Sequence, residues 1–137
     1  MRFMIMVRAN AVSESGAMPE EGLMAAMATY HEQLAKAGAL LDASGLKPSA
    51  QGFRVRYHAG KPSLIDGPFT ETKELIAGYT LIQTRSREEA MEWARRFPAP
   101  FGDQVDCEIE VRQLFELEDF TPNEAVQRFK DLEVRSH

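Results

Sequence analysis

The sequence predicts an α+β fold in which two helices pack on one face of an antiparallel sheet. Two kinds of pattern support this class: amphipathic segments of helical period, and short apolar or alternating segments typical of strands. Their order along the chain is strand, helix, strand, hairpin, strand, helix, strand. At 137 residues the chain has the size of one domain, long enough to bury roughly two-thirds of its unfolded surface in one core.

The first half of the chain opens with an apolar run at residues 3–7, which suits a strand buried on both faces. A helix is expected from Pro19, because proline is favoured at the first helical position, to Gly38, because glycine often follows a helix end. Its apolar stripe consists of Leu23, Met27, Tyr30, Leu34 and Ala37. Residues 39–43 follow as a short strand.

A hairpin is expected between residues 53 and 65. Phe53, Val55 and Tyr57 alternate with polar residues, which is the period of a half-exposed strand. The chain then enters the corner Asp66-Gly67-Pro68-Phe69. Proline donates no ladder hydrogen bond and excludes the helical region for the residue before it, so this segment must turn.

The second half contains the most strand-like segment of the chain, residues 75–84. A capping box formed by Ser86 and Glu89 begins the second helix. Residues 105–111 alternate as a final strand, in which Cys107 is expected to be a small core residue. A second capping box at residues 121–124 begins a last helix. We therefore expect one domain over residues 1–120 and a helical extension over residues 121–137.

This order matches the split βαβ, or ferredoxin-like, plan. Both helices of such a fold lie on one face of the sheet, and the other face stays bare. A large apolar sheet face in a soluble protein predicts a partner, most simply a second copy of the chain. We therefore expect a homodimer or a higher homo-oligomer.

Composition excludes several classes of function. With 16 basic and 21 acidic residues and no dense basic cluster, direct binding of nucleic acid is not expected. The apolar N-terminal run is too short for a signal peptide or a membrane span, which predicts a cytoplasmic protein. Three histidines and one cysteine at scattered positions form no metal-ligand pattern, and no glycine-rich phosphate loop is present, so neither metal nor cofactor is expected.

Several segments together resemble the YCII-related superfamily, specifically its DGPF-domain branch, over about residues 1–120. The matching segments are Gly45-Leu46-Lys47-Pro48, Asp66-Gly67-Pro68-Phe69 with Glu71, Lys73 and Glu74, Gly78-Tyr79, the helix with Ala90 and Trp93, and Glu108-Ile109-Glu110-Val111-Arg112. The resemblance implies a ferredoxin-like protomer that pairs sheet to sheet into a dimeric α/β barrel, with a pocket between sheet and helices. It also implies, by family analogy, association with alternative sigma factors.

The wider superfamily is similar to small lyase- or isomerase-like enzymes that pair a first-helix histidine with an aspartate near the end of the second helix. His31 occupies the matching place in the first helix, but the second helix ends in Arg96-Phe97-Pro98, without the acid. Asp66 is the obvious substitute. His31 is then a candidate general acid or base, or a helix-edge histidine bonded to a neighbour such as Glu32. Asp66 either orients His31 or caps its own turn.

Two further side chains are candidate ligand-binding residues. Arg8, at the end of the first strand, could hold a small anionic ligand, and Tyr79 lines a pocket or belongs to the core. We expect a small-ligand-binding or regulatory accessory protein. The alternative is a lyase- or isomerase-like enzyme that uses His31 as general acid or base. A third interpretation is an assembly module built by the last strand and the C-terminal helix.

Overall fold

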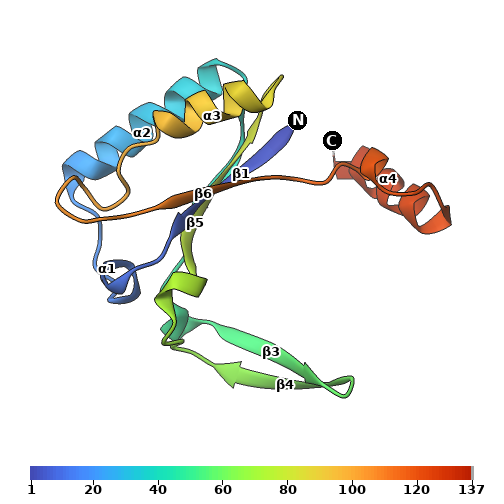
Figure 1. Cartoon of the computed structure of the whole chain (residues 1–137), viewed down its shortest axis with the longest axis horizontal. Coiled ribbons are helices and arrows are strands. Elements are labelled where there is room, and N and C mark those ends of the chain that lie inside the picture. Colours follow the sequence, from blue (N-terminus) through green and yellow to red (C-terminus); the bar gives the residue numbers. More distant parts are fainter. Residues whose placement is uncertain (137) are drawn as a thin grey trace.

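The computed structural model describes residues 1–136, with side chains up to Glu133, so His137 lies outside the described residues. Four strands form an open antiparallel sheet in the order β2-β5-β1-β6. Their bounds are β1 (Arg2–Arg8), β2 (Leu40–Gly45), β5 (Ile76–Gln83) and β6 (Ile109–Gln113). Two helices, α2 (Glu21–Lys36) and α3 (Arg87–Arg95), lie on one face of this sheet (Figure 1). The predicted α+β class is confirmed, and the order of elements is compatible with a ferredoxin-like fold.

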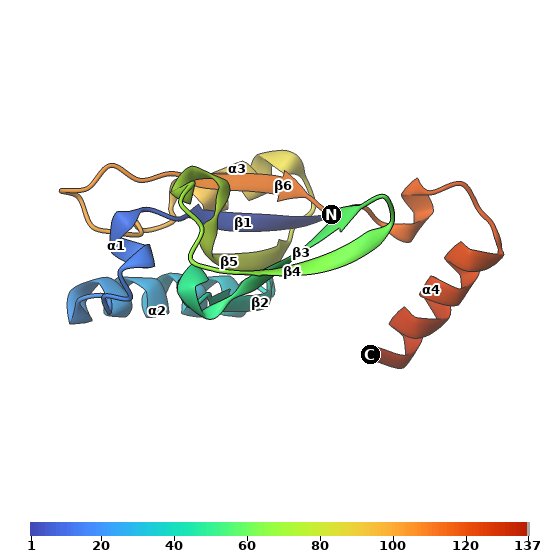
Figure 2. The ribbon, with the colours of Figure 1, turned by 90° about the horizontal axis from the view of Figure 1, so that it is seen from below.

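The remaining elements project from the sheet or connect its strands. A separate hairpin pairs β3 (Phe53–His58) with β4 (Lys61–Asp66). The short elements are α1 (Ala11–Glu14), η1 (Ser49–Gln51), η2 (Thr72–Glu74) and η3 (Leu117–Asp119). The last helix, α4 (Glu124–Ser136), lies beyond the end of the sheet (Figures 1 and 2).

The core lies between the sheet and the two helices. Phe3 and Ile5 of β1 and Ile82 of β5 point toward the helices and are buried. From the helices, the buried members are Tyr30, Leu34, Ala90 and Trp93. The expectation that β1 is buried on both faces is correct for this face alone, because Met4 and Met6 on the opposite face are only half-buried.

The opposite face of the sheet carries no helix (Figure 1). We call it the bare face and define it by Met4, Met6, Tyr79 and Leu81. The register pairs Met4 with Leu81 and Met6 with Tyr79, so these four side chains lie side by side. All four are half-buried. The bare face is therefore an apolar strip down the middle of the sheet.

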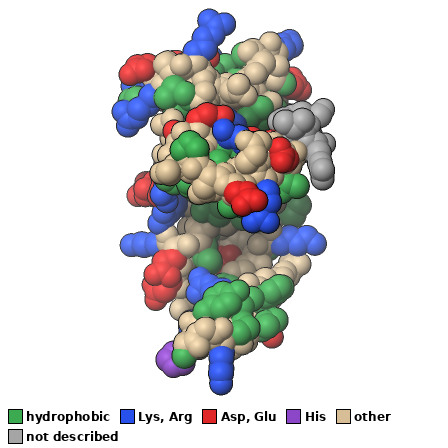
Figure 3. Space-filling model, turned by 90° about the vertical axis from the view of Figure 1, so that its right-hand side faces the viewer, with side chains coloured by type: hydrophobic (Ala, Val, Ile, Leu, Met, Phe, Trp, Pro, Cys, Tyr) green, Lys and Arg blue, Asp and Glu red, His purple; other side chains and the backbone are tan. Residues whose placement is uncertain are grey.

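The hairpin stands clear of the core. Phe53, Tyr57 and Leu64 are 62%, 72% and 71% exposed, although the alternation in the sequence indicated that one face of this strand would be covered. Figure 3 shows hydrophobic side chains gathered over the end of the molecule where the hairpin lies. Within the described part of the single chain, therefore, no helix or sheet covers the apolar face of the hairpin.

The total exposed surface is large for a chain of this size. The chain exposes 10200 Å², whereas a compact monomer of 15.4 kDa exposes roughly 7200 Å². The two projecting elements, the hairpin and α4, contribute to this difference, because Phe53, Tyr57, Leu64, Phe129 and Leu132 are all more than half exposed.

Predicted details of the final strand and of the last helix are wrong. The final strand begins at Ile109, not at Val105, and Cys107 is exposed rather than part of the core. The reason is that β1 ends at Arg8, whose backbone N–H donates to the carbonyl of Glu108 at 3.0 Å, so earlier residues have no strand to pair with. The last helix is capped by the Asn123 side chain, which accepts from the Val126 N–H at 2.8 Å, rather than by Thr121.

Candidate functional site

A cleft of about 640 Å³ opens between the sheet and the first turns of α2. Most of its lining is apolar. The larger apolar side chains are Met18, Leu23, Met24, Met27, Leu46, Phe97 and Phe101. The polar side chains are few, and they include His31 from α2, Thr80 from β5 and Lys47 from the loop after β2. This combination of an apolar wall and a few polar groups is typical of small-molecule sites.

Two glycines form an open floor in the cleft. Gly45 of β2 and Gly78 of β5 are opposite each other in the ladder, and both belong to the lining. A Cβ atom on Gly78 would lie 3.0 Å from the carbonyl oxygen of Ser44, so glycine permits the close approach of the two strands. A Cβ atom on Gly45 would meet nothing within 4 Å. The cleft therefore has free space above Gly45.

His31 is held by both ring nitrogens. Nδ1 lies 2.7 Å from the carbonyl oxygen of Met27, one turn earlier in α2, and Nε2 lies 2.8 Å from Oγ1 of Thr80. Because a carbonyl only accepts, Nδ1 must carry the proton in the neutral ring, and Nε2 then accepts from the Thr80 hydroxyl. The bonded neighbour of His31 is thus Thr80 of β5, not Glu32.

Thr80 is the residue that the sequence analysis missed. Its side chain is 2% exposed and shares the helix-facing side of β5 with Ile82. A hydroxyl at a helix-facing position of a strongly apolar strand was the available signal, because a buried hydroxyl needs a partner. Such a position predicts a partner on the covering helix, and His31 is that partner.

Aromatic packing supports the ring of His31. The ring meets Tyr30 and Phe97 edge to face, with centroids 5.4 Å and 6.3 Å apart. The Tyr30 hydroxyl donates to the carbonyl of Trp93 at 2.7 Å and so ties α2 to α3. Burial raises the pKa of Tyr30 to about 12, so the phenol stays neutral across the physiological range.

Asp66 lies away from the cleft. It ends β4, opposite Phe53, and it is exposed. The residues that line the cleft do not include it, and within the described part of the chain His31 bonds to Met27 and Thr80 instead. The structure thus does not bring the two candidate catalytic side chains together in one cavity.

The corner that contains Asp66 is held by other groups. The N–H of Gly67 donates to the carbonyl of Gly52 at 3.0 Å, and the N–H of Phe69 donates to the Ser49 hydroxyl at 2.9 Å. A Cβ atom on Gly67 would lie 1.8 Å from the backbone oxygen of Ser49, so only glycine fits. Within the described residues no hydrogen bond reaches the Asp66 carboxylate, which therefore does not cap this turn.

Two contacts extend the corner into its surroundings. The guanidinium of Arg54 lies 3.8 Å from the centre of the Phe69 ring, a distance suited to cation–π attraction. Glu14 accepts from the N–H of Ser49 at 3.0 Å and also from its hydroxyl. The Asp-Gly-Pro-Phe segment is accordingly a packing unit that joins α1, η1 and the hairpin.

The two candidate ligand-binding residues have partners outside the cleft. Arg8 forms an ion pair with Glu110 at 3.0 Å and donates to the carbonyl of Lys73. Tyr79 contributes to the lining, but its hydroxyl donates to Asp42 at 2.8 Å, and this bond raises the pKa of Tyr79. Because Thr80 faces the helices, the neighbouring Tyr79 side chain lies on the bare face. The cation at the cleft is Lys47.

Neither a metal-ligand cluster nor a membrane-spanning helix is found in residues 1–136. In that range, no group of three or more histidine, cysteine, aspartate or glutamate side chains is placed to hold a metal ion. None of the described helices combines the length and the hydropathy that a bilayer span needs.

Comparison with known families assigns the chain to a family. The sequence model of the YCII-related domain matches residues 1–117. The chain belongs to the YCII-related family. The match ends before α4, so the last helix of this YCII-related protein lies outside the family domain.

One relative of this YCII-related protein is the uncharacterized protein R00369 of Rhizobium meliloti (strain 1021). The two are 34% identical over 76 residues, which is 56% of this chain and 61% of the relative. The chain thus matches less than two thirds of that protein's length. The relative's name assigns no activity.

Proposed function

We propose that this YCII-related protein binds a small, largely apolar ligand in the cleft, with the His31–Thr80 pair as its polar anchor. The observation that carries the proposal is the position of that pair on the wall of an apolar cleft with an open glycine floor. The cleft volume of about 640 Å³ is within the range of ligand sites, roughly 300–1,000 Å³. The protein would act as a ligand-binding or regulatory accessory protein.

The charge of the ligand follows from the side chains at the cleft. Lys47 is the basic residue of the lining, and it is exposed, so it can meet an acidic group of the ligand without burial of an unpaired charge. Arg8 is engaged by Glu110 on the other side of the sheet. A ligand with an apolar body and one acidic group therefore fits the lining best.

Binding can be tested with 8-anilinonaphthalene-1-sulfonate, whose fused rings and single sulfonate match this description. Gly45→Leu fills the floor without touching His31, and we expect it to weaken binding of the probe at least tenfold. His58→Ala changes an exposed residue at the hairpin and should leave binding unchanged. Equal affinity of wild type and Gly45→Leu would show that the probe binds elsewhere and would exclude the cleft.

The bare face supports a homodimer as part of the proposal. Its apolar strip runs through the two central strands of the sheet, and the chain exposes more surface than a compact monomer of its mass. Stable protein interfaces bury roughly 800 Å² per partner or more. Pairing of two bare faces would cover the strip, and the cleft on the helix-covered face would stay accessible in each copy.

A lyase- or isomerase-like activity is the second candidate. The observation that favours it is the 2.8 Å contact between His31 Nε2 and the Thr80 hydroxyl, because a ring nitrogen at the cleft could take a proton from a substrate that displaces this hydroxyl. Deuterium exchange at carbon acids beside a carboxylate or carbonyl, followed by NMR, tests it. His31→Ala should slow the exchange about a hundred- to ten-thousand-fold, and equal exchange in that variant would exclude the role.

A further inference from the structure

The hairpin and α4 each carry an exposed apolar face in addition to the bare face. The hairpin face consists of Phe53, Val55, Tyr57, Pro62 and Leu64, which share one side of the hairpin by register. The α4 face consists of Ala125, Phe129 and Leu132, spaced four and three residues apart. Phe129 and Leu132 are each 58% exposed, and Tyr57 and Leu64 are 72% and 71% exposed. Side chains of this size and exposure in adjacent positions mark an interaction surface.

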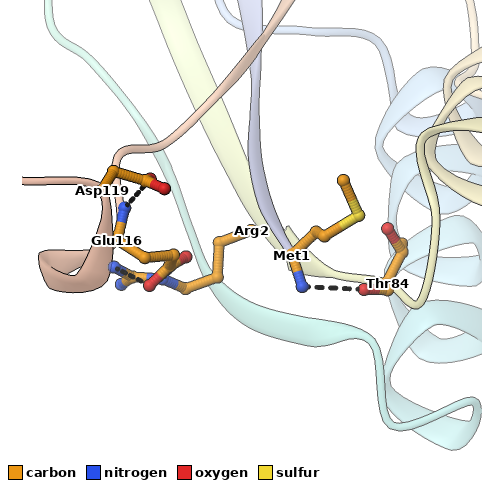
Figure 4. A network of polar contacts seen from close by, with 5 residues as sticks. All are labelled: Met1, Arg2, Thr84, Glu116 and Asp119. Atoms are coloured by element: carbon orange, nitrogen blue, oxygen red, sulfur yellow. Dashed lines mark hydrogen bonds and ion pairs between the residues drawn. The ribbon is translucent and has the colours of Figure 1, made fainter.

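The segment that carries α4 is anchored at its base. Arg2 forms an ion pair with Glu116, with nitrogen–oxygen distances of 2.9 Å and 3.1 Å for the two carboxylate oxygens. The carboxylate of Asp119 accepts from the N–H of Glu116 at 2.8 Å, as Figure 4 shows. The rings of Phe115 and Phe120 lie 5.1 Å apart. These contacts fix the segment that precedes α4, so α4 lies away from the sheet and its apolar face is exposed.

The hairpin and α4 are too far apart to cover each other in one chain. Figure 1 shows them at different ends of the molecule, with open space between them. Each apolar face therefore needs a surface from another molecule.

Charge distinguishes the ways in which two copies could meet. Residues 53–66 contain three basic residues and one acidic residue, whereas residues 117–136 contain five acidic and three basic residues. α4 itself is balanced, with three acidic and three basic residues, and the excess of acid comes from Glu118 and Asp119 of η3, which precedes it. Pairing of hairpin on hairpin would place charges of the same sign together. Contact between the hairpin of one copy and the η3–α4 segment of the other joins opposite net charge, which favours that register.

We propose that α4 of one copy docks its Phe129 and Leu132 on the hairpin face of a second copy, and that the second copy returns the same contact. A twofold axis makes such contacts reciprocal. The inference rests on the proposed homodimer and names the contacts at its margin. It also accounts for the position of α4 beyond the residues that match the family domain, because this contact would be an addition of this chain to the domain.

The test is a cycle of variants in the full chain, with the dimer dissociation constant measured by sedimentation. One variant is Phe129→Ala/Leu132→Ala, the second is Tyr57→Thr/Leu64→Thr, and the third combines all four changes. All four positions are exposed, and the replacements retain helix and strand propensity. Gln127→Ala, an exposed change in the same helix, is the control for α4 and should leave the constant unchanged.

We expect each pair of changes to weaken the dimer about tenfold or more, since buried anchors at interfaces cost at least that much when truncated. The dimer dissociation constant of the combined variant should not exceed the larger of the two constants measured for the double variants, because both double variants remove the same contact. The docking would be overturned if the fold-changes of the two double variants multiplied in the combined variant, or if neither double variant weakened the dimer. Either result would leave the homodimer itself in place. A chain that is monomeric at every concentration would overturn both proposals.

Discussion

The two faces of the central sheet differ in how they are completed. The helix-covered face is fully packed within one chain. Ile5, Leu34 and Ile82 are fully buried there, and the buried hydroxyl of Thr80 has a hydrogen-bond partner in His31. The bare face has apolar side chains of similar size, but they stay half-buried. Alternate residues of the same strands supply both faces. One face thus supplies the core and the cleft within the chain, whereas the other is the surface that the proposed homodimer would cover.

The largest expected effect falls on the helix-covered face. Leu34→Ala removes a fully buried side chain and should lower the free energy of unfolding by about 2–5 kcal/mol, because lost burial and a cavity both contribute. Chemical denaturation measures it. Met18→Ala, at an 86% exposed position, is the control and should cost less than about 0.5 kcal/mol. Equal losses of unfolding free energy at the two positions would show that the helix-covered face is not the stabilising core.

A charge on the bare face should act on assembly instead. In the proposed homodimer, Met6→Asp would bury a carboxylate between two bare faces, and we expect association to weaken at least about hundredfold, or about 3 kcal/mol. The circular dichroism of the monomer should stay near that of the wild type. Light scattering over a concentration series measures the change. Dimers of unaltered affinity in this variant would show that the bare face is not the interface.

The hairpin corner has an intermediate expected effect. Gly67→Ala places a Cβ atom 1.8 Å from the Ser49 backbone oxygen and should cost about 1–3 kcal/mol of unfolding free energy as the backbone shifts. Gly22→Ala is the matched control: it adds a methyl group in α2 with nothing within 4 Å, and it should stabilise by up to about 1 kcal/mol. Similar urea midpoints for the two variants would contradict the packing role of the corner.

The smallest effect is a dependence on pH that arises from the helix-covered face. Burial raises the pKa of Tyr30 from 10.0 to about 12, so the unfolded chain releases this proton at lower pH than the folded chain. The stabilisation is therefore complete below pH 10 and is lost as the pH rises toward 12, with a slope of at most about 1.4 kcal/mol per pH unit. Comparison of denaturation curves of wild type and Tyr30→Phe over this range measures the slope. The same slope in both proteins would assign it to other groups.

The cleft and the Asp-Gly-Pro-Phe corner show which site residues the sequence patterns could predict and which they could not. Helical spacing placed His31 beside the apolar stripe of α2, and the resemblance selected it as a candidate. Its partner could not be predicted in the same way, because Thr80 is 49 residues away and meets His31 only where α2 crosses β5. Asp66 was a candidate because it is the acid of the Asp-Gly-Pro-Phe motif. In the structure, the residue of this motif that the packing constrains is the neighbouring Gly67.

Local chemistry was sufficient for the elements. The apolar run Phe3–Val7, the Ser86 cap and the glycine after α2 all act over a few residues, so the α+β class, the order of elements and the family could be predicted from the sequence. Tertiary structure alone decided which side chains of different elements meet. It paired His31 with Thr80, engaged Arg8 with Glu110, and left the hairpin and α4 uncovered. The physical reason is that such contacts depend on register and on the length of partner strands, and neither is encoded within a single segment.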